Sequence, residues 1–151
     1  MPNSNHSYYL EKTFKLSTQS VENGNHPFGA ILVINDKVVC TSENEVNTLN
    51  DITAHAELRL IQKAQKILSK EELSRSTIYS STEPCAMCSG AIYWAGIKKV
   101  YFGCSAIDLY NIVKGGLNIS SSSIFKDATE APSSSIIYNS KFKEQHIIFW
   151  I

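Results

Sequence analysis

The feature that most constrains the fold is a pair of cysteines, Cys85 and Cys88, directly after Pro84. Because a proline here favours a helix start, both sulfurs are expected on one face of the first helical turn, where a single metal ion can contact both. His55 and Glu57 lie about thirty residues earlier in the chain. A fold that uses these residues together must bring the two segments to one point.

The histidine falls at the start of a predicted helix. Apolar residues recur at helical spacing over 54–68, and the polar residues Asp51 and Thr53 are candidate caps for this helix. His55 is therefore expected in the first turn. In an ideal helix the side chains of His55 and Glu57 diverge, so a ligand that uses both must lie off the helix end.

The cysteine pair falls within a strand, helix, strand pattern. Residues 77–81 are β-rich, 85–95 predict a helix that ends at Gly96, and 99–103 predict another strand. Short connections between such elements indicate a crossover unit, which favours parallel strands and a sheet with helices on its faces.

The N-terminal third predicts one helix and one hairpin. Residues 8–21 carry roughly one apolar face of a helix. Two apolar runs, 28–34 and 37–41, flank Asn35-Asp36, a pair suited to a tight turn between strands. The polar, asparagine-rich stretch 42–53 predicts a loop.

After residue 103 the sequence predicts few regular elements. A short helix is expected over 105–113 and ends at Gly115-Gly116. The serine-rich stretches 119–124 and 131–135 predict loops. Two apolar segments could form a last strand and a packed tail, or surfaces that another subunit covers: 136–138 and 147–150.

Length and composition indicate a single domain over residues 1–151. The chain is 43% hydrophobic and 19% charged, a balance that suits a buried core and argues against disorder or a membrane span. Fourteen basic residues cancel fourteen acidic ones. A nucleic-acid partner would therefore need a local basic patch.

The cysteines and the N-terminus favour a cytoplasmic protein. Residues 1–7 are polar and contain no apolar stretch typical of a signal peptide. In a reducing compartment Cys85 and Cys88 indicate a metal site or a redox pair rather than a structural disulfide. Cys40 and Cys104, within or at the end of predicted strands, are interpreted as buried free thiols.

His55, Cys85 and Cys88 provide the donor set of an open zinc site. Zinc with three protein ligands keeps a fourth position for water, and it lowers the pKa of that water from about 16 to about 7. A helix N-terminus favours the thiolate form of cysteine, which binds metal. Glu57 is suited to take a proton from the water and deliver it to a leaving nitrogen.

Other interpretations of these residues remain open. A Cys-x-x-Cys pair alone could be a redox pair or half of a structural zinc knuckle. A catalytically silent zinc module could use the same ligands, but it would have no need of Glu57. The other histidines lack ligand spacing and are interpreted as ordinary residues: His6, His26 and His146.

His-x-Glu followed by Pro-Cys-x-x-Cys is the signature of zinc deaminases, and the chain resembles the cytidine deaminase superfamily over about 27–102. Segments 50–57 and 82–95 are most similar to the guanine deaminase and tRNA adenosine deaminase branch. The resemblance implies an α/β fold, a three-layer α/β/α sandwich with a central five-stranded mixed sheet, usually as a homodimer. It also implies hydrolytic release of ammonia from an aminated base, with one Zn2+ per chain.

The resemblance also assigns roles to matching positions. It implies that His55, Cys85 and Cys88 hold the zinc and that Glu57 is the catalytic proton shuttle. It further implies three substrate contacts: Asn44 as a hydrogen-bond partner of the base, Phe28 as an aromatic wall, and Ala56.

Two of these contacts have structural alternatives. Asn44 lies in an asparagine-rich loop and could serve as a turn residue. Phe28 opens an apolar strand and could belong to the core.

The expected substrate is a free nucleobase or small nucleoside, with a guanine-like purine favoured. The guanine deaminase pattern places acidic residues after the last helix-like segment, whereas 115–119 here reads Gly-Gly-Leu-Asn-Ile. A tRNA substrate is less favoured because the charge is balanced and arginines are few. Cytosine or another pyrimidine is an alternative, since the zinc chemistry does not set ring size.

Apolar residues around the second helix favour self-association. Tyr93, Trp94 and Ile97 are the candidate surface of a homodimer. Near the chain end, Phe149 or Trp150 could close over the site of the same chain or of a neighbour.

Overall fold

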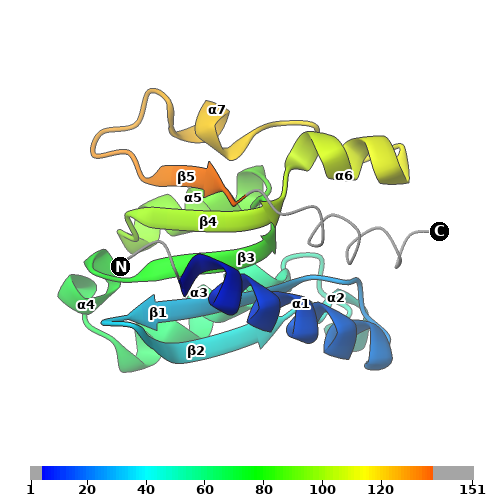
Figure 1. Ribbon diagram of the computed structural model, residues 1–151, viewed down its shortest axis with the longest axis horizontal. Helices are drawn as coiled ribbons and strands as arrows, with labels where there is room; N and C mark the ends of the chain where they lie inside the picture. Colours follow the sequence, from blue (N-terminus) through cyan, green and yellow to red (C-terminus); the bar gives the residue numbers. More distant parts are fainter. Residues whose placement is uncertain (1–4, 138–151) are drawn as a thin grey trace.

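A five-stranded mixed sheet forms the centre of the computed structural model, which describes residues 5–137 (Figure 1). The strand order is β2-β1-β3-β4-β5; β1 pairs antiparallel with β2 and β3, whereas β3 pairs parallel with β4 and β4 parallel with β5. The expected sheet is confirmed. Its strands are β1 (Gly29–Ile34), β2 (Lys37–Glu43), β3 (Thr77–Thr82), β4 (Lys99–Cys104) and β5 (Ser133–Ile136).

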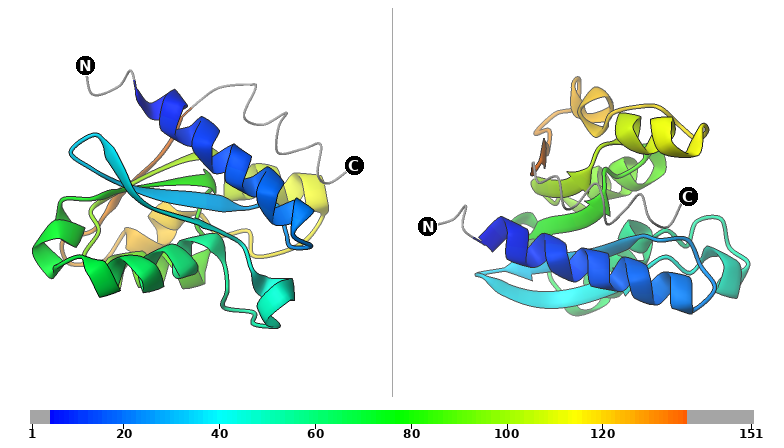
Figure 2. Two further views of the ribbon diagram at one scale, coloured as in Figure 1. Left: turned by 90° about the horizontal axis from the view of Figure 1, so that it is seen from below. Right: turned by 45° about the vertical axis from the view of Figure 1, so that its right-hand side comes forward.

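Helices cover both faces of the sheet, so the expected three-layer architecture is confirmed as well. Helix α1 packs on one face, and α3 and α5 pack on the other (Figure 2). The helices are α1 (His6–Glu22), α2 (Val46–Leu49), α3 (Ala56–Ile67), α4 (Lys70–Ser74), α5 (Ala86–Ala95), α6 (Ala106–Val113) and α7 (Ser121–Phe125).

Strand β1 carries apolar side chains on both faces of the sheet. Successive side chains of a strand point to opposite faces, so Ala30 and Leu32 join the core under α3 and α5. Ile31 and Val33 join the second core, under α1. A strand that is buried on both faces reads as a continuous apolar run, which is the pattern of this segment.

The two turns predicted from local sequence are confirmed. Asn35 and Asp36 both have positive φ, 50° and 62°, as a two-residue hairpin turn with the twist of the strands requires. Gly96 ends α5 with a left-handed φ of 79°.

The predicted start of the helix over 54–68 is wrong. Helix α3 begins at Ala56, and His55 is its N-cap, with extended backbone angles. Asp51 is not the cap, because its Oδ1 accepts hydrogen bonds from the N–H and the hydroxyl of Thr53, at 2.8 and 2.6 Å, within its own turn.

The stretch 42–53 is more regular than the predicted loop. It contains the last residues of β2 and one helical turn, α2. Asn44 Oδ1 accepts a hydrogen bond from the N–H of Val46 at 3.0 Å, and this bond stabilises the start of the turn. The stretch has no apolar periodicity, so the sequence pattern does not predict a helix there. Cys40, predicted to be buried, is partly exposed, whereas Cys104 is buried as expected.

The serine-rich stretches are not the loops that the sequence predicts. Residues 121–125 form α7, which begins where Ser120 Oγ accepts a hydrogen bond from the N–H of Ser123 at 3.2 Å. Residues 133–136 form β5, so the last strand begins earlier than the predicted 136–138. Its backbone pairs with β4, and backbone pairing does not require apolar side chains.

The remaining C-terminal predictions, on segment 147–150 and on Phe149 and Trp150, lie outside the described residues. Within 5–137 no helix combines the length and the hydropathy needed to cross a bilayer.

Candidate metal and active site

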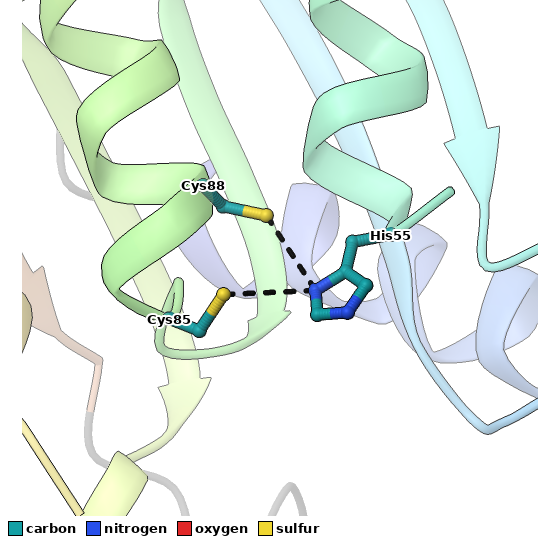
Figure 3. A group of neighbouring side chains, drawn as sticks. All are labelled: His55, Cys85 and Cys88. Carbon is teal, nitrogen blue, oxygen red and sulfur yellow. Dashed lines mark hydrogen bonds between the residues drawn. The ribbon is translucent and has the colours of Figure 1, made fainter. Parts of the chain in front are cut away.

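The starts of two helices meet at one end of the sheet. Strand β3 ends at Thr82, and the chain passes the buried Pro84 into α5, whose N-cap is Cys85. Cys88 lies in the first turn of α5, and His55 caps α3 on the neighbouring side (Figure 3). The fold therefore brings together the three residues that the sequence singles out as ligands.

The geometry of this group suits zinc. His55 Nδ1 lies 3.6 Å from Cys85 Sγ and 3.7 Å from Cys88 Sγ. Zinc bonds of about 2.3 Å to sulfur and about 2.0–2.1 Å to nitrogen, at a tetrahedral angle, place nitrogen and sulfur about 3.5 Å apart. Among the His, Cys, Asp and Glu side chains of the described residues, these three form a group whose ligand atoms lie close enough together to hold a metal ion.

The two thiols share a proton. Hydrogen bonds from Cys88, the larger cause, and from His55 together lower the pKa of Cys85 to about 4. The same Cys85 bond, with burial, raises the pKa of Cys88 well above its ordinary value. One sulfur of the pair is therefore already a thiolate at neutral pH, which is the form that binds zinc.

Glu57 is a buried carboxyl group beside this donor set. Its side chain belongs to the first turn of α3 and is 6% exposed. Burial, the larger cause, and the negative charge of Cys85 together raise its pKa to about 7. Because His55 is the cap and has non-helical backbone angles, its side chain need not follow helical spacing, and both residues reach the same cavity.

A cavity of about 150 Å3 opens beside these residues. Phe28 lines this cavity, although its contact with a substrate stays a prediction, and the lining includes three residues that the sequence interpretation missed. Thr82 and Glu83 could have been found, because they directly precede Pro84 at the end of a strand; Leu109 carries no local signal. The lining residues are Phe28, His55, Glu57, Thr82, Glu83, Cys85 and Leu109.

Two predicted substrate contacts lie beside this cavity rather than on its wall. Asn44 is buried; its side chain bonds to the N–H of Val46, and its own N–H donates to the carbonyl of Phe28 at 3.1 Å. Ala56 is buried in the core under α3. Contact of either residue with a substrate stays a prediction.

A larger cavity, about 600 Å3, lies between α1, β2 and α3. Its lining holds glutamates, asparagines and a lysine but neither histidine nor cysteine. The chemistry therefore belongs to the smaller cavity, where the donor set and the buried carboxyl group are.

Comparison with known proteins agrees with this arrangement. Residues 3–104 match the family model of the cytidine and deoxycytidylate deaminase zinc-binding region. A probable cytosine deaminase of Schizosaccharomyces pombe is 43% identical over 70% of this chain and 64% of its own length. The guanine deaminase of Bacillus subtilis is 41% identical over 69% of this chain and 67% of its own length.

A solved structure has the same fold. It comes from a study of A-to-I editing by tRNA:A34 deaminases, and it is 31% identical, with a TM-score of 0.72 over 87% of this chain and 98% of its own. These relatives are named as deaminases, which are hydrolases that act on C–N bonds. The chain spans less than two thirds of the Schizosaccharomyces pombe relative. Its match over residues 3–104 shows that it belongs to the cytidine and deoxycytidylate deaminase zinc-binding family.

Proposed function

We propose that this protein hydrolytically deaminates a free nucleobase or a small nucleoside, with a guanine-like purine as the favoured substrate. The observation that carries the proposal is the buried Glu57 carboxyl group in the cavity that His55 and Cys85 also line. A structural zinc knuckle needs neither an accessible cavity nor a carboxyl group in it.

The proposed roles follow the geometry. His55, Cys85 and Cys88 would hold one Zn2+, which supplies Lewis acidity that lowers the pKa of a water molecule. A carboxylate oxygen of Glu57 takes the proton of the attacking water and passes it to the departing amine, which leaves as ammonia. Phe28 and Leu109 wall the cavity and exclude water from one side of the base.

The size of the cavity supports a small substrate. About 150 Å3 equals the space of roughly five water molecules, a size that suits a single base. The formal net charge is zero, which favours a small ligand over a phosphate backbone. A guanine-like purine is favoured because 50–57 and 82–95 resemble the branch of guanine deaminases and tRNA adenosine deaminases, whose named substrates are purines.

Cytosine is the second candidate. The 43% identity to a probable cytosine deaminase favours it, and a pyrimidine also fits the cavity volume. Segment 115–119 lacks the acidic residues expected for guanine recognition.

We also propose that residues 1–151 form a single domain and that the protein is cytoplasmic. Cys40, Cys85, Cys88 and Cys104 are free thiols, which suits a reducing cytoplasm.

An ammonia-release screen tests the substrate. The zinc-loaded protein is incubated with guanine, cytosine, isocytosine, adenine, their nucleosides and a tRNA anticodon stem-loop. We expect release from guanine, with cytosine as the next best substrate. Release from the stem-loop alone would contradict a small substrate, and the absence of release from all of them would contradict the hydrolase.

The metal site is tested by zinc content. We expect about one zinc per chain in the purified protein and a large loss in Cys85→Ser, because one of three ligands is removed. Cys40→Ser is the matched control and should keep its zinc. A metal-free protein that cycles a disulfide between Cys85 and Cys88 would favour the redox interpretation instead.

Replacement of the proposed shuttle separates chemistry from metal binding. Glu57→Gln should retain about one zinc per chain while kcat falls by roughly 10²–10⁴-fold, the usual contribution of a general acid–base group. Glu71→Gln changes an exposed carboxylate and should leave kcat unchanged. Undiminished turnover in Glu57→Gln would remove Glu57 from the mechanism.

We further propose a homodimer through α5. Trp94 is 84% exposed and stacks edge-on against Tyr93, whereas Ile97, expected in this surface, is buried in the core. An exposed tryptophan beside a half-buried tyrosine suits a protein interface.

Trp94→Glu should therefore reduce the mass measured by light scattering to that of one chain. Ile67→Glu, at a position 66% exposed on α3, should not. A monomeric wild-type protein would contradict the dimer.

A further inference from the structure

The carboxylate of Glu83 is the meeting point of several segments. One oxygen, Oε1, accepts a hydrogen bond from the N–H of Ala106 at 2.9 Å. The other, Oε2, accepts from both the N–H and the hydroxyl of Ser121, each at 2.6 Å. The main chain of Glu83 adds a fourth bond, from its N–H to the carbonyl of Cys104 at 2.7 Å.

These contacts fix both ends of one segment. Ala106 is the first residue of α6, and Ser121 is the first residue of α7. The side chain of Glu83 therefore accepts hydrogen bonds from both ends of segment 106–121. Ser121 extends the network to β5. Because the Ser121 hydroxyl donates its proton to Glu83, its oxygen accepts the hydrogen bond that joins it to the hydroxyl of Ser134 at 2.6 Å.

The position of α6 depends on such anchors, because packing holds it weakly. None of its residues is buried, although several are apolar. A cavity of about 530 Å3 lies between α6 and the residues before α7, with Glu83 on its wall. The cap of α6, Ser105 Oγ, accepts a hydrogen bond from the N–H of Asp108 at 3.1 Å, a local contact that stabilises the helix start without tying it to another element.

Helix α6 matters to the site because Leu109 lines the smaller cavity together with His55, Glu57 and Cys85. We propose that Glu83 is a positioning residue: it holds α6, and with it Leu109, at the distance from Glu57 and His55 that fits the substrate base. This inference rests on the proposed function. It assigns Glu83 no contact with the reacting atoms and no part in zinc binding.

The chemistry of the contact explains why a carboxylate is needed. All three donors point at Glu83, and an ionised carboxylate presents acceptor positions only. Glutamine has the same shape, but its NH2 group would face an N–H donor. Charge-assisted bonds of this kind are also about twice as strong as neutral ones.

Amide hydrogen exchange in the zinc-loaded full chain tests the anchor directly. In Glu83→Gln, the amides of Ala106 and Ser121 should exchange about ten- to a hundredfold faster than in the wild type, as the loss of a charge-assisted bond implies. Zinc content should stay at about one per chain. Ser121→Ala, which retains the N–H bond, should give a smaller increase, and Ser122→Ala, an exposed neighbour, should give none.

Kinetics test the positioning role. In Glu83→Gln we expect KM for the preferred base to rise about tenfold while kcat changes less than twofold, because a displaced wall weakens binding without removing a reacting group. A fall in kcat at constant KM would overturn the proposal, since it would place Glu83 in the chemistry. Zinc loss with unchanged exchange would overturn it too.

The two proposals fail in different ways. If the wild type releases ammonia from no base, the proposed function is wrong, and the exchange rates of Ala106 and Ser121 still decide whether Glu83 anchors the segment. Unchanged exchange at both amides in Glu83→Gln overturns the anchor whatever the substrate. If that variant does not fold, Ser121→Ala must show the faster exchange, and its absence there counts equally against the anchor.

Discussion

Two helix starts that meet at one end of the sheet determine the rest of the site. The α5 crossover between parallel strands places Cys85 at the end of β3, and α3 enters beside it with His55 as its cap. The first turn of a helix has unpaired N–H groups and a partial positive charge, which stabilises a thiolate there. The two helix starts can therefore supply the metal-ligating residues and the nearby carboxyl group without a dedicated binding loop.

The sequence predicts this part of the molecule well because its signals are local. The spacing of Cys85 and Cys88, the hairpin turn and the helix stop at Gly96 each involve a few consecutive residues, and all are confirmed. The cap of α3 is predicted wrongly because one side chain has two possible local partners. Asp51 could accept a hydrogen bond from the helix start, but it accepts hydrogen bonds from Thr53 instead, and residue propensity alone cannot choose between the two.

The elements after β4, which include the cavity residue Leu109, could not be predicted in the same way. Elements α7 and β5 consist mostly of serine, so no apolar period marks them, and they are held by backbone pairing and by contacts from Glu83 across the fold. Leu109 lines the cavity from α6, and in the proposed arrangement Glu83 holds that helix in place. Metal-ligating residues thus lie at the starts of core-packed helices, whereas Leu109 lies on a helix without a buried residue. Under the proposed function, a change on α6 would alter substrate binding without disturbing the metal site.

The serine-rich strand β5 also affects how the molecule behaves in solution. It is one of the two edge strands of the sheet within the described residues, it is four residues long, and its exposed positions are Ser133 and Ser135. A short polar edge offers a poor template for pairing with a strand of another molecule, whereas an apolar edge invites aggregation. The low hydrophobicity that hides this strand from sequence prediction is thus a protection against uncontrolled sheet extension.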